Sequence, residues 1–181
     1  MKMKRNLGWP ALLFFIALFP ATLGRISPYY NTVLILAGIY VILAVSLDLL
    51  IGFAGQISVG HAAFFALGAY TSGILTAKHG LSPSVALLCG LFVSGLVAWG
   101  IGRAVLRLKG YYLAMATLGL NAVVVKLITG FASLTGGASG LLNIPPFQIF
   151  GLVLQDHTYY YYFVWGIVVL VIGCCLALTR S

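Results

Sequence analysis

Six long apolar segments constrain the fold of this 181-residue chain more than any other feature. A helix needs about 20 residues to cross the hydrocarbon core of a bilayer, and each segment has roughly this length. We expect membrane spans near residues 7–24, 29–51, 57–77, 83–102, 111–131 and 158–178. Because backbone polar groups find no water in lipid, such segments fold as helices. The sequence therefore predicts an all-α, polytopic transmembrane helical bundle of about six spans, in one domain over residues 1–181.

The composition of the chain excludes a soluble globule. Apolar residues make up 62% of the sequence and charged residues only 7%, whereas about 25% of the residues of a soluble domain are charged. The net charge of +8 could suggest a nucleic-acid partner. However, the ten basic residues lie between the apolar segments, where they orient spans in a membrane. We therefore expect contact with membrane lipid and no nucleic-acid partner.

The first apolar segment has two interpretations. It follows Lys2, Lys4 and Arg5 and ends in small residues at 21–24, as a cleaved signal peptide does. Because at least four further spans follow, we favour a first helix that is retained.

Basic residues also predict the orientation, because cytoplasmic loops carry an excess of Lys and Arg. With a cytoplasmic N-terminus, seven basic residues lie inside and three outside. Those inside are Lys2, Lys4, Arg5, Arg103, Arg107, Lys109 and Arg180, and those outside are Arg25, Lys78 and Lys126. Residues 132–157 contain no Lys or Arg and are expected to form an external loop. If the segment 57–77 entered the membrane and returned to the same side, the orientation of every later span would be reversed. The distribution of basic residues disfavours this alternative.

The segment 51–70 is an apolar run interrupted by glycines and polar residues. The residues concerned are Gly52, Gly55, Gly60, Gln56, Ser58 and His61. Interrupted apolar segments allow backbone groups to leave the helix and face a protected pathway. The glycines could instead form only a tight turn, small residues such as Gly68 and Ser72 could serve helix packing, and His61 could simply bond a neighbouring helix. We expect Gln56, Ser58 and His61 at a broken helix beside a translocation path, because unpaired polar groups are costly in lipid.

Two further motifs follow along the chain. The motif at residues 107–119 has a basic start, where Arg107 and Lys109, with Arg103 one turn before, form a cytoplasmic anchor at anionic headgroups. The polar residues Thr117 and Asn121 lie deeper in the same span, and we expect them at the translocation path as well. Residues 134–145 contain Gly136, Gly137 and Gly140. No Lys-Ser or Lys-Thr follows these glycines, so a compact external turn explains them better than a phosphate-binding loop does.

The sequence offers no catalytic or metal centre. No nucleophile–base pair or pair of acids can be assembled, and His61, His79 and His157 lie at no ligand spacing. The cysteines at 89, 174 and 175 all lie in apolar runs, which indicates buried small side chains. We expect neither an enzyme nor a bound cofactor.

Together the three motifs resemble those of the permease subunits of branched-chain amino-acid ABC importers. That family shows G-x-x-G-Q-x-S-x-G-H-A-A-F, R-L-x-G-x-Y-L-A-x-x-T-L-G and T-G-G-x-x-G-L-x-x-I-P, which match residues 52–64, 107–119 and 135–145. The resemblance covers residues 45–181 and implies a subunit of the bacterial inner membrane. It also implies a second permease subunit, two ATPase subunits and an external solute-binding protein as partners. ATP would be used by the ATPase subunits, since this chain has no Walker A motif.

Two departures from the family pattern leave alternatives open. The family usually carries Asn where this chain has Asp48, which could pair with a nearby Arg or Lys, reach the interface, or couple to protons. The family also continues beyond the equivalents of Arg180 and Ser181 into a basic cytoplasmic helix and further spans. We therefore expect an incomplete permease domain that cannot drive transport as it stands. The alternatives are a truncated, non-transporting membrane protein, a small channel or secondary carrier, and a permease for a related solute such as urea or an amide.

Overall fold

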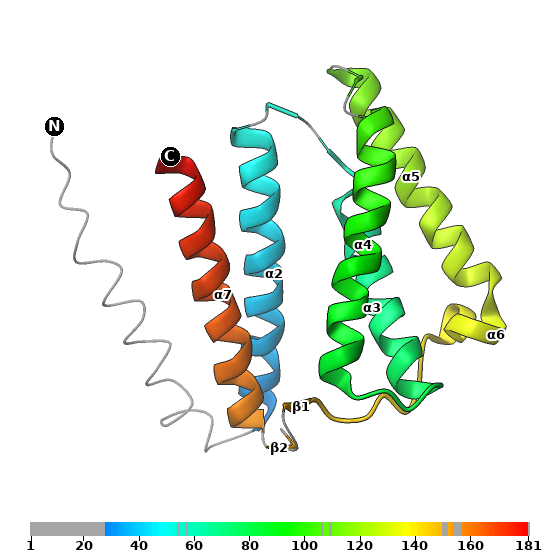
Figure 1. Cartoon of the computed structure of the whole chain (residues 1–181), viewed down its shortest axis with the longest axis vertical. Helices are drawn as coiled ribbons and strands as arrows, with labels where there is room; N and C mark the ends of the chain where they lie inside the picture. Colours follow the sequence, from blue (N-terminus) through cyan, green and yellow to red (C-terminus); the bar gives the residue numbers. More distant parts are fainter. Residues whose placement is uncertain are drawn as a thin grey trace, which may run out of the picture. The chain divides into compact units, whose positions relative to one another are not determined.

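The structure is a computed structural model that describes residues 28–53, 55, 56, 58–105, 107, 108, 110–149, 152, 153 and 157–180. Its elements, in chain order, are α2 (Pro28–Gly52), α3 (His61–Ala77), α4 (Pro83–Val105), α5 (Tyr111–Gly130), α6 (Ala132–Thr135), the 3₁₀ helix η1 (Gly137–Ser139), β1 (Gln148–Ile149), β2 (Leu152–Val153) and α7 (His157–Arg180) (Figure 1). The two strands pair only with each other and are two residues long. The predicted all-α fold is confirmed.

Four of the helices are long and apolar enough to cross a membrane. They cover Tyr29–Gly52, Pro83–Val105, Tyr111–Gly130 and Thr158–Thr179, with mean hydropathies of 2.6, 2.1, 1.7 and 2.4. They agree with four of the six predicted spans. The first predicted span, residues 7–24, lies outside the described residues.

The prediction for the third span is wrong at its start. A helix was expected from residue 57, but α3 begins at His61 and has 17 residues, a length of about 25 Å. The described residues of the connection before it are not helical: Gly55 has a φ of +62°, and the N–H of Val59 bonds to a distant side chain on α5. These residues connect α2 to α3 instead of extending α3.

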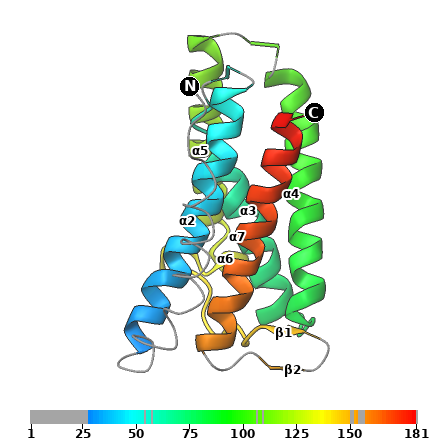
Figure 2. The same ribbon diagram turned by 90° about the vertical axis from the view of Figure 1, so that its left-hand side faces the viewer.

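The chain forms two compact units, and the first contains α7 and α2 as far as Ser46. Its core is formed by Ile35, Tyr161 and Val164. A β-carbon at Gly38 would lie 2.9 Å from Val164 Cγ1, so the absence of a side chain there lets α2 approach α7 closely. The two helices run in the same direction (Figures 1 and 2).

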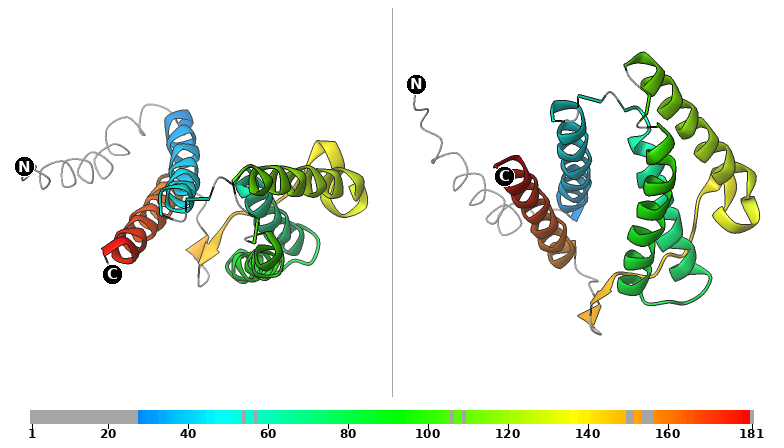
Figure 3. Two further views of the ribbon diagram at one scale, coloured as in Figure 1. Left: turned by 90° about the horizontal axis from the view of Figure 1, so that it is seen from above. Right: turned by 45° about the horizontal axis from the view of Figure 1, so that its top comes forward.

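The second unit, Leu47–Val153, is built around α3, which lies against both α4 and α5 (Figure 3). Helices α3 and α4 come close together at two glycines: a β-carbon at Gly90 would lie 2.7 Å from the carbonyl oxygen of Gly68. Ser72 and Ser94, each four residues further along, also line this crossing. The predicted packing role of Gly68 and Ser72 therefore has a partner on α4 with the same small-x-x-x-small spacing.

One end of this second unit is closed by the connections between helices. Lys78, after α3, donates a hydrogen bond through its ammonium group to the carbonyl of Ser133, and the hydroxyl of Ser84 donates to the carbonyl of Gln148. These bonds place the α3–α4 turn beside the segment that follows α5. A β-carbon at Gly73 of α3 would lie 3.1 Å from the side chain of Leu141 in the same segment. The predicted external loop is thus a folded structure in its described part.

Glycines make this connection compact, as the sequence suggested. Gly136, Gly137 and Gly140 have φ angles of +79°, +62° and +72°, a region that L-residues with side chains rarely adopt. The hydroxyl of Thr135 donates to the carbonyl of Phe131 at 2.9 Å and accepts the N–H of Gly137 at 3.1 Å. Side chain and backbone together close the turn.

The direction of the first-unit helices also bears on the number of crossings. Because α2 and α7 run in the same direction, the chain must cross the bilayer an odd number of times between them. Counting α3, α4 and α5 gives three crossings. If α3 entered the membrane and returned to the same side, only two crossings would remain, and α7 would run antiparallel to α2. The parallel pair therefore fits α3 as a crossing helix.

Candidate translocation site

The polar residues that interrupt the apolar run lie where α2 gives way to α3. Gln56 and Ser58 are half-buried in the non-helical connection, and His61 is the half-buried first residue of α3. Along the chain, a polar side chain therefore occurs at nearly every second position from Gln56 to the start of α3.

Glycine fixes how α2 ends. Gly55 has a φ of +62°, and the N–H of Gln56 then returns to the carbonyl of Leu50 at 3.3 Å. The end of α3 repeats this pattern, with Gly80 at +63° and the N–H of Leu81 bonded to the carbonyl of Leu75 at 3.1 Å. At both ends the left-handed glycine turns the chain out of the helix.

Gly52 differs from the other glycines of the motif. It is the last residue of α2, and a β-carbon added to it would have no neighbour within 4 Å. The geometry therefore requires glycine at Gly55 and not at Gly52.

The connection is tied to α5 through one side chain, Thr117, which is 5% exposed. Its hydroxyl oxygen accepts the N–H of Val59 at 3.0 Å, and its hydroxyl group donates to the carbonyl of Ala114 at 3.0 Å. A β-carbon at Gly60 would lie 3.0 Å from the carbonyl oxygen of Thr117. We call this contact of Val59 and Gly60 with Thr117 the α5 junction. It joins the first two motifs of the sequence, which are 58 residues apart at the hydrogen bond.

Of the five predicted path residues, His61 begins α3, and the other four differ in their contacts. Thr117 uses its hydroxyl group both as donor and as acceptor within the α5 junction. Asn121 is half-buried one helical turn further along α5, and Gln56 lies three residues before Val59. Among the described residues, no hydrogen bond involves the side chains of Gln56, Ser58 or Asn121.

The basic anchor lies at the other end of the second unit from the closed connections. Arg103, in the last turn of α4, places its guanidinium 5.0 Å from the centroid of the Trp99 ring. Arg107 is exposed, and Lys109 lies outside the described residues. Asp48 is also exposed, and within the described part of the chain no ion pair joins it to Arg103 or Arg107.

Comparison with known proteins decides the family. The family described as branched-chain amino acid transport system / permease component matches residues 29–181. This chain belongs to that family. The assignment made from the three motifs is thereby confirmed. The family and the long apolar helices together show that this permease-family chain is a multi-pass membrane protein.

Two curated relatives have the printed name "High-affinity branched-chain amino acid transport system permease protein LivM". The protein from Salmonella typhimurium is 35% identical over 155 residues, which is 86% of this chain and 36% of the relative. The protein from Escherichia coli is 34% identical over 149 residues, which is 82% of this chain and 34% of the relative. The permease-family chain thus aligns with about a third of each relative's length. No solved structure matches it.

Several contacts of this permease-family chain were not singled out from the sequence. Gly90 and Ser94 have the same spacing as Gly68 and Ser72, so the small-x-x-x-small pattern on α4 was a readable signal. Gly38 on α2 and the bond of Lys78 to the Ser133 carbonyl carried no such signal.

Proposed function

We propose that this chain is part of the permease subunit of an ABC importer for branched-chain amino acids and that it forms part of the translocation path. The family and the names of the relatives support the transport system. The observation that supports the path is the connection that follows α2 in the chain, which carries half-buried polar side chains and is held on α5 by Thr117. Irregular backbone at membrane depth is tolerated where it lines a cavity.

In this proposal Gln56, Ser58 and Asn121 supply hydrogen bonds to a passing amino acid. An amino acid carries a carboxylate that needs donors and an ammonium group that needs acceptors, and amide and hydroxyl side chains offer both. Thr117 has a different role, because its hydroxyl group is engaged in the α5 junction. It positions the connection and leaves solute contacts to its neighbours.

The proposed subunit works with partners in the inner membrane. A second permease subunit completes the path, two ATPase subunits use ATP, and an external solute-binding protein delivers the solute. The N-terminus and the end of the second unit that carries Arg103 are cytoplasmic, which agrees with the seven-to-three distribution of basic residues. The connections around Lys78 and residues 131–149 then face outward.

The proposal is tested by ATP-dependent leucine uptake in proteoliposomes that hold the transporter assembly with the complete permease subunit to which this chain is proposed to belong. Gln56→Leu and Ser58→Leu are each expected to reduce uptake at least ten-fold, because each removes a polar group from the path. Val59→Leu is the matched control, since it lies in the same connection, keeps its backbone N–H for Thr117 and has an exposed side chain. Equal uptake by all three variants would show that the connection serves helix packing alone.

A further inference from the structure

The end of α4 combines an exposed aromatic ring with a cation that has no acidic partner among the described residues. The guanidinium of Arg103 lies 5.0 Å from the centroid of the Trp99 ring, within the range of a cation–π interaction. Asp48 is the only acidic residue among those described, and no described ion pair involves Arg103. The positive charge is therefore not neutralised within the described part of this chain.

A row of apolar side chains leads along α4 to this pair. Leu88, Phe92, Leu96 and Trp99 follow one another at spacings of three or four residues, and each is between 51% and 67% exposed. This spacing places them on one face of the helix. The face that contacts α3, with Gly90 and Ser94, is a different one.

The length of this row matches one leaflet of a bilayer. Eleven residues separate Leu88 from Trp99, and at 1.5 Å per residue they extend about 16 Å along the helix. Half of the roughly 30 Å hydrocarbon core is about 15 Å. An acyl chain whose headgroup lies at Arg103 would therefore run along the whole row.

We infer that α4 binds one anionic phospholipid, with the phosphate on Arg103 above Trp99 and an acyl chain along Leu96, Phe92 and Leu88. The ring of Trp99 lies one helical turn before Arg103, which places it at the depth where aromatic residues meet headgroups.

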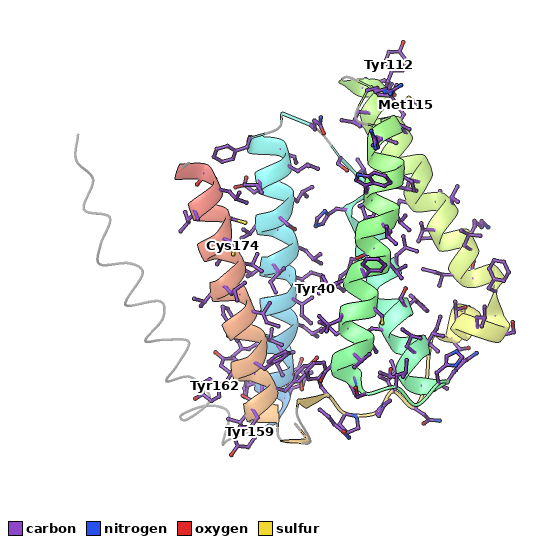
Figure 4. All side chains as sticks on the ribbon, in the orientation of Figure 1. Tyr40, Tyr112, Met115, Tyr159, Tyr162 and Cys174 are labelled. Atoms are coloured by element: carbon purple, nitrogen blue, oxygen red, sulfur yellow. The ribbon has the colours of Figure 1, made fainter. Side chains whose placement is uncertain are left out.

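Aromatic residues at the start of α5 mark the same interface. Tyr111 and Tyr112 are each 73% exposed, and Tyr112 extends beyond the helix ends (Figure 4). Amphipathic rings of this kind collect at the boundary between headgroups and hydrocarbon.

The test uses the tryptophan as its own reporter. Trp9→Phe and Trp165→Phe leave Trp99 as the only tryptophan of the 181-residue chain. The indole nitrogen of Trp165 is buried without a partner, so phenylalanine removes an unsatisfied group there. The chain is reconstituted into phosphatidylcholine vesicles that contain brominated phosphatidylglycerol or brominated phosphatidylcholine at equal mole fraction, and quenching of Trp99 is measured.

Brominated phosphatidylglycerol is expected to associate with the Trp99 site about five-fold more strongly than brominated phosphatidylcholine, the effect of one cation near an anionic surface. Arg103→Gln should bring this ratio close to one. Lys126→Gln is the matched control, because it removes the same charge from an exposed site on α5 and should keep the preference.

Three outcomes would overturn the inference: equal quenching by both lipids, a preference that survives Arg103→Gln, or no quenching by either lipid because protein covers the row. Native mass spectrometry of the unmodified chain gives an independent measure. One retained phosphatidylglycerol should be lost in Arg103→Gln and kept in Lys126→Gln, and retention in both variants would contradict a site at Arg103.

Discussion

Replacing Thr117 with valine removes one oxygen atom from the α5 junction and keeps the shape of the side chain. The N–H of Val59 then loses its acceptor at 3.0 Å, whereas the carbonyl of Ala114 keeps its place in the helix. An unsatisfied buried N–H costs about 1–3 kcal/mol. Because Val59 is 45% exposed, water can replace part of the bond, and we expect a loss near the lower limit, about 1 kcal/mol.

Such a loss shifts the docking of the connection on α5 about five-fold toward the undocked state. Hydrogen exchange of a peptide that contains the amide of Val59, measured by mass spectrometry in nanodiscs, should accelerate by about this factor in Thr117→Val. Thr117→Ser is the control, because it keeps the hydroxyl group and should exchange like the unmodified protein. Identical exchange in the valine variant and the unmodified protein would refute the idea that this hydrogen bond holds the connection.

Two further predictions concern helix packing and orientation. Gly90→Ala should destabilise the chain by about 1–3 kcal/mol, because its β-carbon would lie 2.7 Å from the Gly68 carbonyl oxygen. Gly95→Ala is the control, because its β-carbon would have no neighbour within 4 Å, and this variant should unfold at or above the original temperature. Equal thermal unfolding of the two variants in detergent would contradict the close crossing. In a cysteine-free background, an impermeant thiol reagent added outside cells should label a cysteine at Ser139 and not one at Leu108, and the reverse result would invert the proposed topology.

Most of the helical architecture could be predicted because it depends on local apolar pattern. The four predicted spans that coincide with long apolar helices are segments whose length and composition alone indicate a crossing helix. The start of α3 could not be located from the sequence, because Ser58 and Gly60 show that the apolar run is interrupted but not where the helix begins. The N–H of Val59 bonds to a hydroxyl 58 residues away. A contact between segments so far apart leaves no periodic signal in either one.

The candidate site shows the same limit. The sequence singled out Gln56, Ser58 and Thr117 as polar residues in apolar surroundings, which is a local property. Only the structure separates their roles, since Thr117 has its hydroxyl engaged between Val59 and Ala114 while Ser58 lies in the connection that this bond holds. Which glycines are needed for geometry is also a question of backbone angle and neighbours, as the difference between Gly52 and Gly55 shows.

The central claim is that the connection between α2 and α3 lines the path of the solute, and the reactivity of one cysteine tests it most directly. Ser58→Cys is made in the transporter assembly after Cys89, Cys174 and Cys175 are replaced by alanine. A charged, water-soluble thiol reagent should modify this cysteine, and saturating leucine should slow the reaction. A cysteine at Leu88, on the exposed apolar row of α4, is the control and should not react. A cysteine at position 58 that does not react, or that reacts at the same rate with and without leucine, would contradict a solute path at this connection.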